Sequence, residues 1–556
     1  MGNRRGQTVV LAYLAVVVFT VLGGSLLSQS LTTHRHQQRQ QLQDDVFYLA
    51  EGGLEDVIGR FAQAIANFQV EANVSRYPVS GSLVTTFSSG RSAATVITEA
   101  EPSPRTVPDP DGISVFVKNY HVATTVTHPA YPAVAVTLHQ IVSRRIIYAF
   151  QHAVFYDGDL EWLPGPDMTL SGRVHSNSDV YLGTHGLLTV NCDYLRAVGK
   201  LFNKRKDSPG TPMGGIVQVK KAGTSPPHYA AMAGLDSSSP AWATESQTRW
   251  AGTVKTDVHG VTRRAVPVVG SIAPGGFYDT NAGMKVVNGT VSVGGTVLTP
   301  GVDIPPNTVT TSTTFYNNRE GKRVRMTNID LRRLAGYHDV DGDGVLDPPG
   351  TPGNPYTNKL PANGLIFATR NDALSTEQPG IRLLNGSEIR RAGGLTVVSN
   401  TPMYLQGHFN TVSKKPVAVI ADALNLLSTN WNDANSAANN VNSGGPRTAS
   451  NTTYNAAFIA GIDTTSAGRY NGGLENYPRL HEHWSGRTLS ITGSFVSLWN
   501  SQVATGAWRY GQQAARSQYT APTRNWAYDA SFASGTAMPP FTPWAVEITK
   551  GAWWQD

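Results

Sequence analysis

The sequence predicts a mainly β protein that has one long α-helix at its N-terminus and an irregular parallel β-solenoid after it. Three observations predict this fold class. Residues 8–27 are uncharged and mostly apolar. Charged residues are only 15 % of the 556-residue chain, below the roughly 25 % of ordinary soluble domains. Glycine is abundant, with 55 residues, as in turn-rich exported β proteins. A multi-sheet β-sandwich is the alternative fold.

The N-terminal helix is predicted in two parts. Residues 8–27 would extend about 30 Å as a helix, which is the thickness of a bilayer core. After a polar stretch, apolar residues recur at helical spacings of three and four: Phe47, Ala50, Leu54, Val57, Ile58 and Phe61. One helix over residues 7–64 explains both parts. A secretory signal peptide would instead end in a small-x-small cleavage site and a change of character.

The residues at the two ends of this helix resemble those of type IV pilin-like proteins. Arg4-Arg5-Gly6 precedes the apolar run, and residues 47–55 read Phe-Tyr-Leu-Ala-Glu-Gly-Gly-Leu-Glu. The pattern is most similar to PilX-type minor pilins, to which the K-type minor pseudopilins of type II secretion are related. Blocks at 155–160, 172–179 and 472–486 also look like parts of large pilus-associated proteins that carry this N-terminus.

That resemblance implies a location and a set of partners. The chain would insert in the bacterial inner membrane as a single-pass protein, and prepilin peptidase would cut between Gly6 and Gln7, with methylation of the new N-terminus. The helix would then pack against other pilins in a surface filament. The resemblance implies no enzymatic activity for the large ectodomain.

One position departs from the pattern of the family. Major pilins carry a glutamate at the fifth residue after the cut, where this chain has Leu11. Such a carboxylate neutralises the N-terminal ammonium of a neighbouring subunit, and an unpaired buried charge costs several kcal/mol. We therefore expect a subunit at the filament tip, or one that primes assembly, rather than one that repeats along the shaft.

Charge and cysteine content exclude other classes. The net charge is +6, and the one basic cluster, at 200–206, is short. With no basic helix and no zinc-finger spacing, the sequence predicts no nucleic-acid binding. Cys192 is the single cysteine, which excludes an internal disulfide; we interpret it as a small core residue.

Changes in pattern along the chain predict six segments. They are a leader at 1–6, the helix at 7–64, a neck and β-strand segment at 65–155, a first β-rich part of the ectodomain at 156–330, a calcium-loop insertion at 331–360, and a second, aromatic-rich β part at 361–556. Alternating residues in the third segment predict strands at 113–120, 133–140 and 145–155.

An internal echo is the basis of the solenoid prediction. Residues 174–182 and 397–405 both read Val-x-Ser-Asn, then three residues, then Tyr-Leu. We interpret each as a strand, an Asn turn and a second strand within one coil, with Asn side chains satisfying turn backbone groups. Related strand units recur at 187–190, 216–219, 284–298, 417–427 and 489–498, and low-complexity insertions at 224–249 and 430–451.

The sharpest motif for chemistry is an aspartate-rich loop. Oxygen ligands at alternate positions, with Gly344 at the sixth, match a short calcium loop; the predicted ligands are Asp339, Asp341, Asp343, the carbonyl of Val345, and Asp347. Position twelve is Gly350 rather than the glutamate of an EF-hand. We expect Ca²⁺ to rigidify this loop. A metal-free Asp/Gly surface turn is the alternative.

Other candidates carry weaker signals. His481-Glu482-His483, and His175 with Asp179, lack the helical spacing of hydrolytic zinc sites. Eight of eleven Trp lie at or after Trp431, which favours core and end-capping roles. The terminal pair, Trp553-Trp554, is the best candidate among them for contact with a ligand or partner.

Three functions follow. The first is a minor-pilin-like structural subunit that is not an enzyme. It would either initiate filament assembly or contact a surface or glycan ligand. The second is a membrane-anchored β-helix enzyme on polysaccharide, which needs paired carboxylates; its acidic candidates are Asp157, Asp159, Glu475 and Glu482. The third is an anchored adhesin that never enters a filament.

Overall fold

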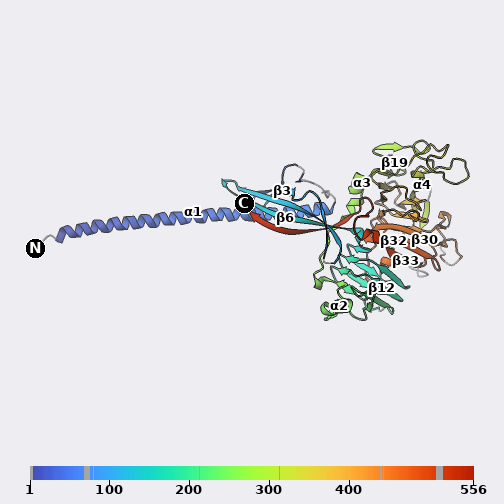
Figure 1. Cartoon of the computed structure of the whole chain (residues 1–556), viewed down its shortest axis with the longest axis horizontal. Coiled ribbons are helices and arrows are strands. Elements are labelled where there is room, and N and C mark those ends of the chain that lie inside the picture. The colour runs from blue at the N-terminus through green and yellow to red at the C-terminus, as the bar shows by residue number, and fades with distance from the viewer. Residues whose placement is uncertain are drawn as a thin grey trace.

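A computed structural model describes residues 4–67, 76–78, 80–109, 111–211, 213–311, 314–438, 441, 444–508 and 518–556. A long helix extends from a β-rich body (Figure 1). Residues 1–3 of the predicted leader, 68–75 of the predicted neck, and 439–440 and 442–443 of one predicted insertion lie outside the described residues.

The N-terminal helix, α1, runs from Arg4–Ala66 over 63 residues, slightly longer than predicted at both ends. Within the described residues it is the one helix long and apolar enough to cross a membrane, and its most apolar 18-residue window is not buried. Figure 1 shows that its first half projects away from the rest of the molecule. The prediction of one long N-terminal helix is confirmed.

The second half of α1 packs on an antiparallel sheet, and together they form what we call the stalk. The order is β1-β3-β5-β6-β34, with β2 beside β3 and β4 beside β5. The strands are β1 (Arg76–Tyr77), β2 (Leu83–Thr86), β3 (Ser92–Glu99), β4 (Arg105–Pro108), β5 (Ser114–His128), β6 (Tyr131–Tyr148) and β34 (Trp544–Gln555). Of the predicted helix stripe, Phe47 is half-buried and the other five residues are buried in the stalk core. Residues expected as a neck thus supply strands β2 to β4.

Gly53 lets the helix and the sheet approach closely. A Cβ at this position would clash with the Cβ of Ala93 on β3 and lie 3.3 Å from Cγ2 of Thr124 on β5. The C-terminal strand β34 closes the same sheet against β6, and the chain ends beside α1 (Figure 1). Trp544 Nε1 donates a hydrogen bond to the carbonyl of Ile65 at 3.2 Å, so the end of α1 and the C-terminal strand meet in the stalk.

The strands predicted at 133–140 and 145–155 differ from the structure. β6 is continuous across the intervening residues, and the 3₁₀ turn Ala149–Gln151 separates it from the next strand, β7 (Val154–Tyr156). The gap between the two predicted strands, residues 141–144, ends at the charged residue Arg144. Arg144 is buried, however, with its guanidinium 5.8 Å from the ring centre of Tyr120, and Arg145 pairs with Glu547 on β34. Both charged side chains therefore have partners on neighbouring strands, and β6 continues past them without a break.

Residues 149–543, which we call the head, consist largely of parallel strands in two stacks. In the first stack the chain passes in turn through three ladders. They are β7 (Val154–Tyr156), β10 (Val174–Ser176), β13 (Leu195–Ala197) and β17 (Val254–Lys255); β8 (Leu160–Trp162), β11 (Val180–Leu182) and β14 (Leu201–Phe202); and β9 (Met168–Ser171), β12 (Leu187–Asn191) and β15 (Ile216–Lys220), to which β16 (Tyr229–Ala231) adds antiparallel. Val174 pairs with Val154 and with Leu195, so the first two turns of chain take about twenty residues each.

The second stack has two main ladders. One contains β18 (Met284–Val287), β24 (Leu365–Thr369), β26 (Leu395–Val398), β28 (Val417–Ala421), β30 (Thr452–Ala460), β32 (Thr488–Ser497) and β33 (Thr523–Tyr528), with β19 (Thr290–Val293) and β20 (Thr296–Leu298) antiparallel at its edge. The other contains β23 (Lys322–Asp330), β25 (Glu377–Leu384), β27 (Met403–Gln406), β29 (Leu424–Leu427) and β31 (Arg479–Leu480), with β21 (Val309–Thr310) and β22 (Thr314–Asn317). Short helices are α2 (Trp242–Trp250), α3 (Phe277–Asn281) and α4 (Leu331–Leu334).

The two stacks meet where β7 pairs in parallel with β32, through Val496 opposite Phe155. The head core is continuous across this junction. A mainly β chain with one long N-terminal helix and several mostly parallel sheets is therefore confirmed.

The internal echo occupies equivalent places in the two stacks. Its first halves lie on β10 and β26, and its second halves on β11 and β27. The turn between them depends on the serine rather than the asparagine. Oγ of Ser176 accepts from the backbone N–H of Ser178 at 3.1 Å, and Oγ of Ser399 accepts from that of Thr401 at 3.0 Å. The asparagines instead bond to neighbouring turns, as Asn177 does to Asp157.

Candidate functional site

The first half of α1 is an apolar surface without a covering layer in the described chain. Its exposed apolar residues are Val9, Val10, Leu11, Tyr13, Leu14, Val16, Val17, Val18, Phe19, Val21, Leu22, Leu26, Leu27 and Leu31. Burial begins at Val46, where the stalk sheet starts to cover the helix. The backbone of Gly6 and Gln7 lies in the first turns of α1.

The aspartate-rich loop follows α4 and precedes β24. Backbone pairing of His338 with Asp347 closes it, with N···O distances of 3.0 and 2.8 Å. One carboxylate oxygen each from Asp339, Asp341 and Asp347 lies within 4.8 Å of the others. Asp343 is outside this group, and its Oδ1 accepts from the N–H of Val345 at 2.7 Å. The structure thus brings together three of the four predicted carboxylates.

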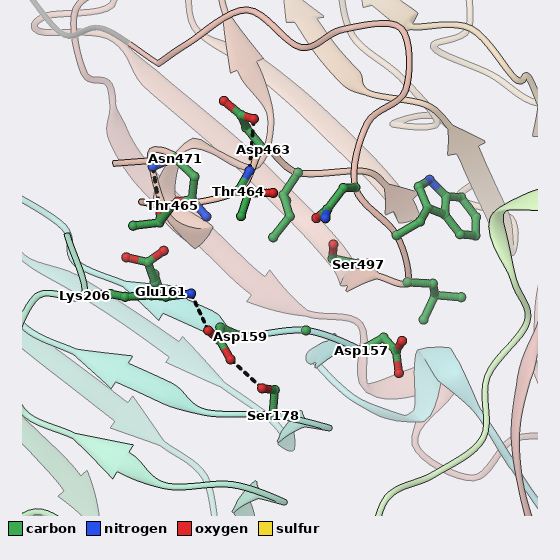
Figure 2. Close-up of a pocket in the computed structure, with 15 residues that line it drawn as sticks. Asp157, Asp159, Glu161, Ser178, Lys206, Asp463, Thr464, Thr465, Asn471 and Ser497 are labelled. Carbon is green, nitrogen blue, oxygen red and sulfur yellow. Dashed lines mark hydrogen bonds and ion pairs between the residues drawn. The ribbon is translucent and has the colours of Figure 1, made fainter. Parts of the chain in front are cut away.

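A polar cleft opens at the junction of the two stacks (Figure 2). Parallel strands β7, β30 and β32 end here, and beyond them the first stack turns into β8 while the second stack continues in loops. Chains that diverge beyond the carboxyl ends of parallel strands leave a crevice, as in open α/β sheets. The cleft has a volume of about 330 Å³. Its wall from the first stack carries Asp157, Asp159, Glu161, Ser178 and Lys206, and its opposite wall carries 462–465, Asn471 and 497–500.

Asp159 is held as a carboxylate on the first wall. Nζ of Lys206 donates to its Oδ2 at 2.5 Å and Oγ of Ser178 donates to its Oδ1 at 2.5 Å, as Figure 2 shows. Burial would raise the pKa of Asp159, but these two hydrogen bonds outweigh burial and hold the pKa below its usual range.

Glu161, two residues further on β8, has the opposite electrostatic setting. Glu161 is only 2 % exposed, and burial raises the pKa of its carboxyl to about 7, although a hydrogen bond with Thr465 acts to lower it. Figure 2 shows Glu161 and Thr465 on facing walls. Its Oε2 is buried without a hydrogen-bond partner among the described residues. Trp499, another cleft residue, has its Nε1 in the same condition.

The three aspartates that line the cleft are each paired with a basic side chain. Arg263 contacts both carboxylate oxygens of Asp157, at 2.7 and 2.9 Å. Lys206 pairs with Asp159, and Arg469 pairs with Asp463 at 2.9 Å. The cleft therefore has many hydrogen-bonding groups and little net charge.

The four acidic residues predicted for the enzyme alternative do not form one group. Asp157 and Asp159 line the cleft. Glu475 lines a neighbouring cavity of about 250 Å³, where its Oε1 accepts from the hydroxyl of Tyr470 at 2.9 Å and its Oε2 from the N–H of Leu163 at 3.1 Å. Glu482 is buried in the head and binds the N–H and hydroxyl of Ser428 at 2.7 and 2.6 Å. Burial raises the pKa of Glu475, and that of Glu482 to about 7.

The weaker candidates occupy structural positions. His175 bonds to Tyr194 and Asn177, and His481 to Asn425; burial lowers the pKa of each histidine to about 3, which keeps both neutral. Cys192 is buried in the head core, as predicted.

The late tryptophans are spread over several environments. Trp484 is fully buried, whereas Trp553 and Trp554 are 47 % and 38 % exposed on β34. Trp554 stacks on His121 and His139. The terminal pair is thus exposed, as expected, but belongs to the stalk sheet.

Sequence reasoning missed Glu161, Asp463, Thr465, Asn471 and Trp499 as one group. Only the alternation Asp157, Asp159, Glu161 carried a signal, because residues two apart on a strand share a face. The opposite wall comes from segments about three hundred residues later, and the junction of β7 with β32 that joins them left no sequence pattern.

Comparison with known proteins assigns no family. No family model matches the chain, and no curated protein matches it significantly. Among solved structures, the competence-associated pilin ComZ from Thermus thermophilus aligns with 92 % of this chain and 97 % of its own, at 10 % identity and a TM-score of 0.24. A TM-score this low does not establish a shared fold.

Proposed function

We propose that this protein is a minor-pilin-like structural subunit of a type IV pilus or related filament, with its head displayed at the filament surface. The observation that carries the proposal is the division of α1: an exposed apolar first half and a second half buried under the stalk sheet. An apolar helix of this length is stable in a bilayer or in a bundle of similar helices, not in water. The leader pattern ending at Gly6 supports the same role.

Cell fractionation tests this proposal through the processing site. The wild-type chain should begin at Gln7 and be recovered with surface filaments removed by shearing. Gly6→Leu should block cleavage and keep the full-length chain in the inner membrane, whereas Gly2→Leu, a matched change earlier in the leader, should behave as the wild type. A Gly6→Leu chain that starts at Gln7 in the sheared fraction would contradict the proposal.

We further propose a tip or priming position for the subunit, supported by Leu11, because a shaft subunit lacking a carboxylate there would leave a neighbour's ammonium unpaired. Immunogold labelling should find the wild type at filament ends. Leu11→Glu should move part of the label along the shaft, and unchanged end labelling would contradict this position.

Within the head, we propose that the stacked ladders form an irregular solenoid and that the aspartate loop binds Ca²⁺ as its cofactor. Support for the metal comes from the convergence of Asp339, Asp341 and Asp347 and from the preference of Ca²⁺ for six to eight oxygen ligands. The carbonyl of Val345 and the carboxylate of Asp343 would complete the shell after a local rearrangement.

Calorimetric titration tests the calcium proposal. The full chain should bind about one Ca²⁺ with a Kd of about 0.1–1 mM, the range of extracellular sites, and protease sensitivity near residues 337–352 should fall. Asp341→Asn should abolish the signal, while Asp257→Asn, elsewhere in the head, should leave it unchanged. No heat with Ca²⁺ on the wild type would remove the proposal.

A further inference from the structure

The cleft at the junction of the two stacks has the features of a binding site that the filament role does not use. It is lined by residues of the head alone, and its two walls come from distant parts of the sequence (Figure 2). Its volume of about 330 Å³ is within the range of small-molecule pockets. We infer that this cleft binds a neutral saccharide of about two sugar units.

The first argument is the pair of unsatisfied polar atoms. Oε2 of Glu161 and Nε1 of Trp499 are buried and lack hydrogen-bond partners among the described residues, and both residues line the cleft. Leaving such groups unpaired is costly, and native proteins rarely do so without a reason. A bound molecule with hydroxyl groups would satisfy both atoms, since a hydroxyl accepts from an indole N–H and can donate to or accept from a carboxyl.

The second argument is charge. The carboxylates of Asp157, Asp159 and Asp463 are already paired with Arg263, Lys206 and Arg469. A cation would have to compete with these partners, and an anion would face three carboxylates. A neutral ligand with many hydrogen-bond donors and acceptors would neither compete with these cations nor be repelled by the carboxylates.

The third argument is the composition of the walls. Thr464, Thr465 and Asn471 offer hydroxyl and amide groups on one wall, and Ser178 offers a hydroxyl on the other. Trp499 adds an aromatic ring. Polar groups that fix hydrogen bonds, next to one flat apolar ring, match a sugar, which has polar edges and less polar C–H faces.

Glu161 should give this binding a characteristic pH dependence. Groups that act on it electrostatically are Lys206, Glu475 and Asp207, and it acts in turn on Tyr156, Tyr181, Tyr470 and Arg205. Below its pKa of about 7 the carboxyl is neutral and can donate a hydrogen bond to a sugar hydroxyl; above it, the carboxylate has no proton to donate and can only accept. Affinity should therefore fall as the pH rises through neutrality.

The proposal goes beyond the proposed function, and its test needs no filament. The full chain, purified in a detergent without a sugar headgroup, is titrated with maltose, cellobiose, lactose and chitobiose while heat and Trp fluorescence are followed. At least one disaccharide should bind with a Kd of about 1 mM or tighter. If none of the four binds, the inference is wrong, and the filament role, tested by processing at Gly6, is unaffected.

Variants locate the binding. Trp499→Ala and Glu161→Leu should each weaken it by about 10-fold or more, the loss expected when a buried hydrogen bond is removed. Trp553→Ala, an exposed tryptophan on β34, should leave it unchanged. E161Q keeps a neutral hydrogen-bond donor and should make the affinity independent of pH from about 5 to 8. If Glu161 had only a structural role, this substitution would not change the pH dependence of binding. Binding that survives both cleft variants, or a wild-type affinity that does not fall above neutral pH, would overturn the assignment.

Discussion

The stalk and the head solve the same problem, burial of β-strands, in different ways. In the stalk, antiparallel strands from both ends of the sequence pack one face against α1, and β34 returns almost four hundred residues after β6. In the head, strands pair in parallel with neighbours in successive turns of chain, so most contacts form over short sequence distances. The stalk therefore depends on one helix–sheet interface, while the head spreads its core over many repeated layers.

The largest expected effect comes from a substitution in the core of the stalk, and it tests whether the stalk and the head unfold as independent units. Phe61 is fully buried, with its ring centre 5.0 Å from that of Tyr120. Phe61→Ala should cost about 3–5 kcal/mol of unfolding free energy, confined to the stalk. Hydrogen exchange on the full chain in detergent should show faster exchange in β5 and β6 and unchanged exchange in β26 and β28. Phe19→Ala, on the exposed part of α1, is the control; equal loss of protection in the head would contradict independent units.

The next effect belongs to the head, which contains two buried acids with a pKa raised to about 7, Glu161 and Glu482. An acid whose folded pKa is raised binds its proton more tightly in the folded state, so stability is highest at low pH. It should fall as the pH rises from about 4.5 to about 7, by about 3 kcal/mol for each group.

Denaturant unfolding at several pH values measures this loss. Glu482→Gln should remove the share of the loss that this group contributes, about 3 kcal/mol, and leave the shares of Glu161 and Glu475, whose pKa values burial also raises. Glu245→Gln, a partly exposed helix residue, should not alter it. A wild-type head whose stability is constant across this interval would show that these carboxyls are ionised in the folded state.

The smallest expected effect tests how closely α1 approaches the stalk sheet. In an exposed helix, Gly→Ala stabilises by about 1 kcal/mol, and Gly59→Ala should do so because its Cβ would meet open space. Gly53→Ala should destabilise by about 1–2 kcal/mol, because overpacking against Ala93 exceeds the helix gain. Thermal unfolding of the two variants gives the comparison directly, and stabilisation by both would mean that the interface is looser than the structure has it.

Sequence reasoning succeeded where the pattern was local. The helical spacing from Ala50 to Phe61 predicted the face of α1 that packs in the stalk core, because residues three and four apart share one side of a helix. The repeated Ser-Asn turns at 176 and 399 predicted equivalent strand pairs in the two stacks. Both signals are contained within about fifteen residues of chain.

It failed where structure depends on distant partners. A break at 141–144 was predicted inside what is one continuous strand, and the partners that accommodate Arg144 and Arg145 there, Tyr120 and Glu547, lie elsewhere in the sequence. The cleft was missed for the same reason: Glu161 meets Thr465 only because β7 pairs with β32.

The central claim is that the exposed apolar half of α1 leaves the membrane to pack against similar helices of other subunits. A photo-crosslinking residue at position 19, where Phe19 is 73 % exposed, tests it most directly in sheared surface filaments. The account predicts adducts with the N-terminal helices of other filament subunits, and none from the same probe at the buried position 57. Absence of the protein from the sheared filaments, or adducts at position 19 with lipid alone, would contradict it.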